Sequence, residues 1–315
     1  MEPEKGTANS RRKILITGAS NGIGKGAALI LAQALPPGSE LILLCRSSAA
    51  GKAVIEVIKR LAPHCSTTLL LCDLTKMGAV KAAITEVTKK YDHLDALFIN
   101  AGIGYAARRI ETEDGMDAHF QVNYLAQFML TLRLLPLLEK SNFGGRIIFN
   151  ATHFGQIFWD DMQLQNDWTY EKAIFQSMAA KRMFLRYLHR LYRQIPQSRL
   201  SFIGYQVRKT VWSNQLNIIP KTMKMMASLV KLFGGFISVE DSGRDMLPLF
   251  LENETLSVEK SGKLITSKKN LFPEIAESNE ILDEHAQEKL WQISLELCKD
   301  EETRNIATQI KSRTS

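Results

Sequence analysis

The chain has 315 residues, of which 45% are hydrophobic and 23% are charged, and its formal net charge is +7. This length can bury a large core, and the composition is typical of globular proteins rather than of disordered chains. Although the net charge is positive, the lysines and arginines are scattered and no basic stripe is interleaved with aromatic residues, so we expect no nucleic-acid partner.

Short apolar runs alternate along the chain with segments whose apolar residues recur at helical spacing. The runs predict strands at residues 13–18, 40–45, 67–72, 95–100, 145–150, 199–204 and 262–266. The two longest helical patterns predict helices over 117–139 and 170–192. Continuous apolar strands separated by helices indicate a parallel sheet covered on both faces. The expected fold class is α/β, a doubly wound parallel sheet of the Rossmann type in a single domain.

The two ends of the chain are more polar than its centre. Residues 1–12 contain no apolar leader segment, and we expect a flexible tail there. One domain should cover 13–300, followed by a polar tail at 301–315. No run approaches the ~18 apolar residues of a membrane span, and the four cysteines show no CxxC spacing. These features favour a cytoplasmic protein without a metal site.

The first predicted strand runs into a glycine-rich turn, ILITGASNGIGKG. Gly18, Gly22 and Gly24 stand in the spacing G-x-x-x-G-x-G, between a strand and a helix. Glycine permits a tight turn and lets backbone amides approach a pyrophosphate at a helix N-terminus. Because the turn follows a strand and opens a helix, it predicts a dinucleotide-binding site.

The end of the second predicted strand indicates which dinucleotide binds. An acidic residue about twenty positions after the glycines would bind the ribose 2′-hydroxyl of NAD. The sequence here is LLCRSS, with Arg46 in that place. A guanidinium suits a 2′-phosphate through charge-assisted hydrogen bonds, so we predict NADP as the cofactor. The alternative interpretation is that Arg46 is a solvated surface residue.

Several further motifs follow in the order seen in short-chain dehydrogenases/reductases. After TGASNGIG come CDLT with Asp73, NAG at 100–102, and VNYLAQFMLT with Asn123. The stretches WDDMQ, at 159–163, and SGKLI…DEHAQEKLWQISLEL resemble the retinol-dehydrogenase-like branch of that superfamily. The resemblance extends from about residue 13 to about residue 300.

The resemblance implies where the cofactor and the chemistry would lie. Asp73 would hold the adenine end, residues 100–102 would line the central portion of the cofactor, and Asn123 would anchor the water of a proton relay. The cofactor contacts expected from the turn and the resemblance are Gly18, Ser20, Asn21, Gly22, Ile23, Gly24, Arg46, Asp73, Leu74, Asn100, Ala101, Gly102 and Thr210.

The catalytic part of the family pattern is altered. Members carry a serine after the fifth strand and Tyr-x-x-x-Lys on the next long helix, where the lysine charge lowers the pKa of the tyrosine. Here Thr152 takes the place of the serine and keeps a hydroxyl. The string KAIFQSMAAKR aligns Ile174 with the tyrosine and Met178 with the lysine, and neither can donate a proton. Tyr205 and Gln206 stand where the family has Pro-Gly after the sixth strand.

Other groups could supply the proton. His153 lies beside Thr152 and could act as acid or base, or could be a capping histidine. Tyr170 stands one helical turn before Ile174, as a displaced donor or a packing residue, and Lys181 stands about one turn after Met178. The candidate catalytic residues are Asn123, Thr152, His153 and Tyr170.

By the resemblance, residues 211–240 would form a lid over the substrate. The stretch IPKTMKMMASLVKLFGGFI, at 219–237, is rich in methionine and lysine. Such a lid suits a small lipophilic substrate, its lysines also suit contact with a membrane surface, and an amphipathic helix that closes the core is the alternative. Family members often dimerise through the two long helices after the fourth and fifth strands, so a homodimer is an analogy to be tested.

The sequence thus predicts an NADP-binding oxidoreductase that acts on a lipophilic carbonyl or alcohol with an atypical or impaired proton relay. Two alternatives stay open. One is a non-redox catalyst on the same scaffold, such as a cyclase, isomerase or dehydratase, and the other is a catalytically inactive NADP-binding regulatory protein.

Overall fold

The computed structural model describes residues 11–211, 224–225, 228, 235–251, 254–269 and 271–314. At its centre lies a seven-stranded parallel sheet in the order β3-β2-β1-β4-β5-β6-β9. The strands are β1 (Lys13–Thr17), β2 (Glu40–Cys45), β3 (Ser66–Leu71), β4 (Ala96–Ile99), β5 (Arg146–Asn150), β6 (Ser201–Gln206) and β9 (Leu264–Thr266). Because the strand order reverses beside β1, the sheet is doubly wound, as predicted.

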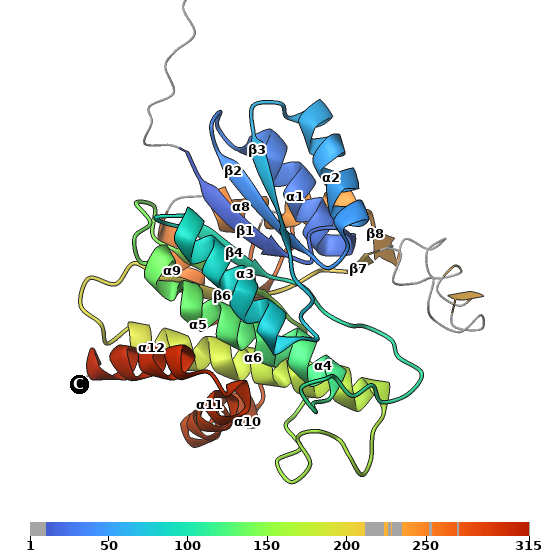
Figure 1. Ribbon diagram of the computed structural model, residues 1–315, viewed down its shortest axis with the longest axis vertical. Coiled ribbons are helices and arrows are strands. Elements are labelled where there is room, and N and C mark those ends of the chain that lie inside the picture. The colour runs from blue at the N-terminus through green and yellow to red at the C-terminus, as the bar shows by residue number, and fades with distance from the viewer. Residues whose placement is uncertain are drawn as a thin grey trace, which may run out of the picture.

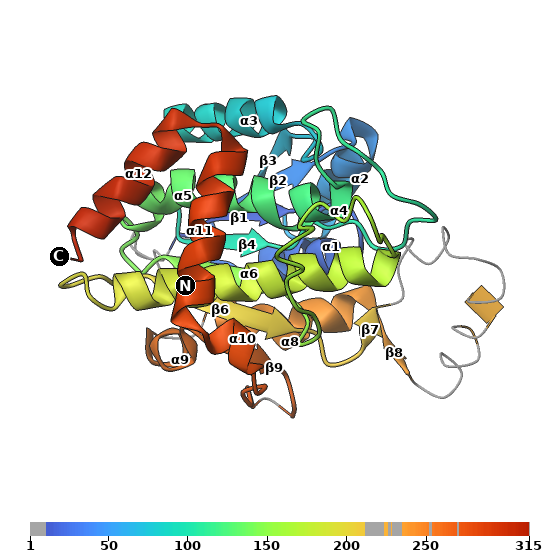
Figure 2. The same ribbon diagram turned by 90° about the horizontal axis from the view of Figure 1, so that it is seen from below.

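Helices cover both faces of this sheet. They are α1 (Gly22–Ala34), α2 (Ser48–Leu61), α3 (Met77–Lys90), α4 (Ala118–Phe120), the π-helical segment η2 (Gln121–Leu125), α5 (Ala126–Leu138), α6 (Tyr170–Tyr192), α8 (Val239–Leu251), α9 (Glu254–Lys260), α10 (Asn279–Leu282), α11 (Glu284–Cys298) and α12 (Glu301–Ser312). Helices α1, α2 and α8 lie on one face, and α3, α5 and α6 lie on the other (Figure 1). Helices α11 and α12 form an outer layer over α5 and α6 (Figure 2).

The sheet separates two apolar layers. Along β5, Ile147 and Phe149 pack into the layer of α5 and α6, whereas Ile148 packs into the layer under α1 and α8. All three side chains are buried, as expected for a strand whose apolar run is continuous rather than alternating. Because both faces are covered, a polar ligand reaches the sheet at the carboxyl ends of its strands.

The last helix differs from the sequence prediction. We expect a polar tail at 301–315, but α12 is a packed helix whose Thr303 and Ile310 are buried. Asp300 caps it by accepting a hydrogen bond from the Thr303 N–H at 3.0 Å, and it also pairs with Arg133 of α5 at 3.1 Å. A narrow apolar stripe and one buried ion pair are enough to dock a helix that is polar in composition.

Helices α11 and α12 cover the surface of α5 and α6 on which the dimer analogy depends. Trp291 of α11 is buried, and its ring centroid lies 5.5 Å from that of Phe128 on α5 and 4.7 Å from that of Tyr187 on α6. A homodimer stays a prediction, but contact through these faces would first have to displace the indole ring.

The segment predicted as a lid lies mostly outside the described residues. Its two ends are described, because β7 (Thr210–Val211) and β8 (Phe236–Ile237) pair in parallel. Within the segment, the Met225 side chain is 64% exposed. The pairing of β7 with β8 therefore brings the start and the end of the predicted lid together.

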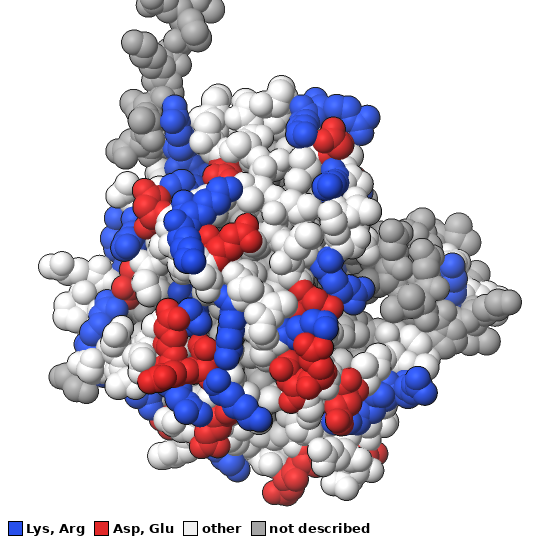
Figure 3. Space-filling model, in the orientation of Figure 1, with Lys and Arg blue, Asp and Glu red and all other residues white. Residues whose placement is uncertain are grey.

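Charged side chains of both signs are mixed on the surface. Figure 3 shows lysine and arginine interspersed with aspartate and glutamate over the face in view. In the part of the chain that the structure describes, no helix is long and apolar enough to cross a bilayer, and no group of His, Cys, Asp and Glu side chains could hold a metal ion. All four cysteines are buried free thiols.

Candidate active site

The glycine-rich turn after β1 is closely packed. Gly18 and Gly22 have φ angles of +68° and +51°, in the left-handed region that favours glycine. A Cβ atom on Gly24 would lie 2.4 Å from the carbonyl oxygen of Gly18 and 2.5 Å from Nδ2 of Asn100. The start of α1 therefore sits directly against the ends of β1 and β4, with no room for a side chain between them.

The first turn of α1 suits an anion. Its N-cap residue, Asn21, makes no side-chain capping bond, and no acidic residue lies in this turn. The first backbone N–H groups of a helix have no partner within the helix, and together with the helix dipole they favour a phosphate. Ser20 is half-buried in the turn, and Ile23 packs against the core, which helps to hold the turn in place.

A chain of amide side chains joins the ends of β1, β4 and β5. Asn100 Nδ2 donates to the carbonyl oxygen of Thr17 at 2.9 Å, and Asn150 Nδ2 donates to Asn100 Oδ1 at 3.1 Å. The hydroxyl oxygen of Thr17 accepts from the backbone N–H groups of Asn100 and Ala101 at 2.8 and 2.9 Å. Sequence reasoning missed Asn150, although a polar residue that closes the apolar run RIIFN is a usable signal.

The residues predicted for the adenosine half lie at the ends of β2 and β3. Arg46 directly follows β2 and is exposed, so its guanidinium can reach a ligand at the sheet edge. Asp73 Oδ1 accepts from the N–H and the hydroxyl of Thr75 at 3.0 and 2.8 Å, and among the described residues Oδ2 accepts no hydrogen bond, so it can contact a ligand. The Leu74 side chain is buried in the core, so only its main chain could contact a cofactor. Thr210 is exposed on β7, at the start of the predicted lid.

Asn123 lies in the π-helical segment η2 and is fully buried. Its Oδ1 accepts from the Ile103 N–H at 2.7 Å, and its Nδ2 donates to the Ile103 carbonyl at 3.2 Å and to Ser177 Oγ at 3.1 Å. A Cβ on Gly102 would lie 3.1 Å from that same Oδ1. Since both polar atoms of the Asn123 side chain are already hydrogen-bonded, a relay water would have to bond a backbone group of η2. π-Helical turns such as η2 are frequent at functional sites.

Thr152 and His153 follow β5. The Thr152 hydroxyl oxygen is buried and makes no hydrogen bond within the described ranges. Leaving such a group unpaired is costly, so this atom indicates a polar ligand or a water. His153 is exposed, and its backbone N–H and its Nδ1 both contact Gln206 Oε1 at 2.8 Å. Because an amide oxygen only accepts, Nδ1 carries the proton in this pairing, and Nε2 of the neutral ring is able to accept one.

The face of α6 on which we predict the family's tyrosine and lysine positions is apolar. Ile174 and Met178 lie one turn apart and are half-buried. Tyr170 begins the helix, and its ring centroid lies 5.1 Å from that of Tyr105. A hydrogen bond with Glu171 raises the pKa of Tyr170, whereas a donor that works near neutral pH needs the opposite shift. A catalytic role for Tyr170 stays a prediction that its surroundings do not support.

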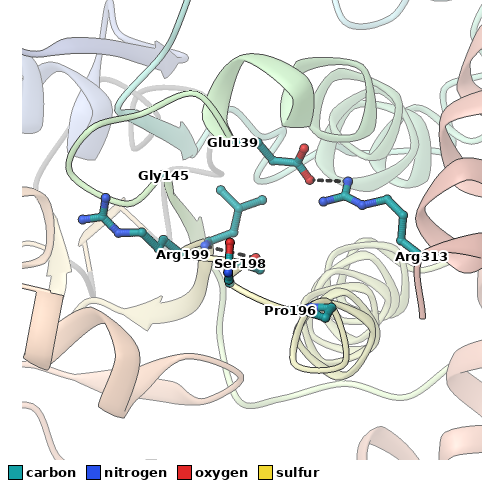
Figure 4. Close-up of a pocket in the computed structure, with 8 residues that line it drawn as sticks. Glu139, Gly145, Pro196, Ser198, Arg199 and Arg313 are labelled. Carbon is teal, nitrogen blue, oxygen red and sulfur yellow. Dashed lines mark hydrogen bonds and ion pairs between the residues drawn. The ribbon is translucent and has the colours of Figure 1, made fainter. Parts of the chain in front are cut away.

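Two other features do not join this site. Tyr205 belongs to β6 rather than to the loop that follows, and its ring is buried in the layer under α1 and α8, so it forms no helical pair with Lys209. A hollow of about 290 Å³ is lined by Gly145, which precedes β5, and by the ion pair between Glu139 and Arg313 (Figure 4). This hollow is at the amino ends of the strands, opposite the glycine turn.

The sequence matches known proteins over about half of its length. Residues 12–162 match the family model for short chain dehydrogenases. The chain is 31% identical over 186 residues to human polyprenol dehydrogenase, a match that covers 57% of this chain and 55% of that protein. It is 31% identical over 195 residues to human retinol dehydrogenase 14, covering 57% and 56%. The matches therefore span about half the length of these curated relatives.

Solved structures share the fold. An uncharacterised protein of Mycobacterium paratuberculosis aligns with 93% of this chain and 95% of its own, at a TM-score of 0.68 and 20% identity. A short chain dehydrogenase of Shigella flexneri, solved with NADP, aligns with 82% of this chain and 98% of its own, at a TM-score of 0.57 and 24% identity. Structures at this identity establish the fold alone. The family model over residues 12–162 and the two curated relatives support the short-chain dehydrogenase/reductase superfamily, and its retinol-dehydrogenase-like branch, as the family that this chain resembles.

Proposed function

We propose that the chain binds NADP and acts as an oxidoreductase on a small lipophilic alcohol or carbonyl compound, with an altered proton relay. The observation that carries this proposal is the turn in which Gly24 has no room for a Cβ beside Gly18 and Asn100. With the first N–H groups of α1, the turn forms a cradle for a pyrophosphate. Two relatives are named for polyprenol and retinol, which are both long apolar alcohols, and this supports the substrate class.

The residues at the strand ends fit a nicotinamide dinucleotide that carries a 2′-phosphate. Arg46 offers an exposed guanidinium where a carboxylate would be needed to bind the 2′-hydroxyl of NAD. Asp73 keeps Oδ2 available for the adenosine half. The amide chain through Asn100 and Asn150 holds the ends of β4 and β5 in place under the other half.

In this proposal the bound nicotinamide supplies or accepts the hydride, and the residues of this chain bind the substrate oxygen and transfer the proton. The free hydroxyl of Thr152 would donate a hydrogen bond to the substrate oxygen. His153 is the neighbouring titratable group, and its exposed position would let Nε2 exchange a proton with solvent. Ile174 and Met178 would give an apolar substrate a surface to pack on. Because loss of a dedicated proton donor commonly costs on the order of 10²–10⁴ in rate, we expect slow turnover.

A regulatory protein that binds NADP without turnover is the second candidate. The observation that favours it is the contrast between a complete cradle and a helix face on which Ile174 and Met178 carry no acid or base. A non-redox catalyst on the same scaffold is the third candidate, and it would use the same apolar surface as a shaped pocket.

A fluorescence titration with NADPH, followed by a turnover assay with long-chain and retinoid aldehydes, separates these candidates. Saturable binding with NADPH oxidation and alcohol formation supports the oxidoreductase. Binding without turnover supports the regulatory protein, and a new product without change in NADPH absorbance supports the non-redox catalyst. Failure to saturate at millimolar NADPH would contradict the proposal, whatever the fold.

A further inference from the structure

Helix α6 buries a lysine beneath the end of β5. Lys181 is 2% exposed, and its Nζ donates a hydrogen bond to the carbonyl oxygen of Asn150 at 2.9 Å. Side chains on a helix tilt toward its N-terminus, so the long side chain of Lys181 extends back toward the turn that carries Met178. An amine therefore lies under the strand ends even though the positions of Ile174 and Met178 are apolar.

This amine is connected to the glycine turn. Asn150, which accepts its hydrogen bond, donates to Asn100, and Asn100 donates to the carbonyl oxygen of Thr17 next to Gly18. The chain of hydrogen bonds runs along the carboxyl ends of β5, β4 and β1. Lys181 is therefore linked, through the main chain of Asn150 and the side chains of Asn150 and Asn100, to the groups that shape the cradle.

The surroundings of Lys181 do not suit a permanent charge. An ammonium has three N–H donors, whereas the described residues give this one a single acceptor. Burial lowers the pKa of Lys181 to about 7, and no neighbouring charge contributes to that shift. Arg182, on the same helix, turns instead to Glu277 and to the carbonyl oxygen of Phe154, and His153, the titratable group after β5, is exposed. The amine can thus change its charge near neutral pH without breaking an ion pair.

The strand order places this amine under one half of the cofactor. A dinucleotide crosses a doubly wound sheet at the point where the strand order reverses, so its halves lie on either side of β1. Arg46 marks the adenosine half at β2, which leaves the ends of β4, β5 and β6 for the nicotinamide half. The oxidised nicotinamide ring is positively charged and the reduced ring is neutral, so an ammonium nearby is repelled only by the oxidised form.

We propose that Lys181 is a positioning residue that takes up a proton when the reduced cofactor binds and thereby favours NADPH over NADP⁺. This inference rests on the proposed function, because it requires that the chain bind the cofactor. The difference in binding free energy between NADPH and NADP⁺ would then come from a buried amine rather than from surface cations.

Calorimetry tests the proposal without any turnover. NADPH and NADP⁺ are titrated near pH 7 in buffers of different ionisation enthalpy, which gives the protons taken up per cofactor bound. If NADPH tightens the hold of Lys181 on its proton tenfold, the wild type takes up about 0.4 protons, and its Kd rises about eightfold between about pH 6 and about pH 9. Lys181→Met should lose this uptake and also the Lys181-dependent preference for NADPH. Lys181→Arg should lose the uptake but keep the preference, because arginine stays charged.

Two controls make the result specific. Lys172→Met removes a lysine of the same helix that pairs with Asp167, and it should take up protons as the wild type does. The cofactor's own phosphate can also take up protons on binding, and the difference in uptake between the wild type and Lys181→Met removes that contribution. In parallel, an NMR titration should show the Lys181 side chain of the free protein changing charge near neutral pH.

The outcomes of this test and of the proposed function are distinguishable. Equal proton uptake by the wild type and Lys181→Met, or a Lys181 titration near the ordinary pKa of 10.5, overturns the inference and leaves the proposed function standing. A wild type that binds no NADPH overturns both.

Discussion

Replacing Gly24 with alanine tests the cradle most directly. The added Cβ would lie 2.4 Å from the carbonyl oxygen of Gly18 and 2.5 Å from Asn100 Nδ2. These distances are about 1 Å shorter than the ~3.5 Å of ordinary contact, so the turn must open. Overpacking of this kind costs about 1–3 kcal/mol in the free energy of unfolding, which should lower Tm by on the order of 5 °C.

The opening of the turn should weaken cofactor binding as well. Each hydrogen bond from a backbone amide to a charged phosphate contributes about 1.5–3 kcal/mol. Displacing one such amide in Gly24→Ala should therefore raise the Kd for NADPH by roughly tenfold to a hundredfold. Fluorescence titration measures the Kd, and thermal unfolding without cofactor measures the change in stability.

Two matched glycines separate binding from stability. Gly78 of α3 has open space where a Cβ would go, so Gly78→Ala should leave both quantities almost unchanged. A Cβ on Gly26 would lie 2.0 Å from the carbonyl oxygen of Val239, on the side of α1 that faces α8. Gly26→Ala should therefore lower Tm and leave the NADPH affinity of the folded protein intact. Wild-type affinity in Gly24→Ala, or an equal loss of affinity in Gly26→Ala, would refute the assignment of the cradle.

Three further predictions concern the rest of the site. Arg46→Ser should weaken NADPH binding tenfold or more, because a charge-assisted bond to the 2′-phosphate is worth about 1.5–3 kcal/mol, and it should leave NADH binding unchanged in the same titration; an equal loss for both cofactors would contradict the role of Arg46. The double variant Ile174→Tyr/Met178→Lys should raise aldehyde reduction by about 10²-fold or more, measured as NADPH consumption, because it restores a donor beside a cation; unchanged turnover would show that these two positions do not limit the rate. The unfolded chain binds the Lys181 proton below pH 10.5 and the folded chain only below about 7, so the free energy of unfolding should fall as the pH is lowered from 10.5 to 7. Lys181→Met should remove that slope and add on the order of 4 kcal/mol near neutral pH, measured by urea unfolding at several pH values. The same slope in the variant as in the wild type would show that the amine is solvated.

The elements that the sequence predicts well are those whose burial is continuous. The pattern over 170–192 gave both ends of α6, because an apolar stripe runs along its whole length and Thr169 caps its first turn. At 301–315 the sequence predicts a polar tail, whereas the structure has the packed helix α12. This helix depends on a few buried side chains and on the pairing of Asp300 with Arg133 of α5, which no local pattern contains.

In the candidate site, too, features fixed by local backbone constraints are predictable from the sequence, and contacts between distant residues are not. The glycine turn was predictable, because backbone conformation and close approach restrict Gly18 and Gly24 to one residue type. The contact between His153 and Gln206 was not, because it joins residues 53 positions apart at the ends of adjacent strands. Lys181 was visible only as a lysine about one turn after Met178, and its burial decides its chemistry.

The free-energy cost of Lys181 bears on whether the site is active. A buried amine with one hydrogen bond is destabilising, and a methionine would fill the same space without that penalty. A chain whose only task was to hold its core together would therefore be more stable without the amine. By contrast, the burial of this amine is what lowers its pKa, because the charged form loses its hydration there. A pKa of about 7 keeps Lys181 between its two charge states near neutral pH, where the binding of a charged ligand can shift it.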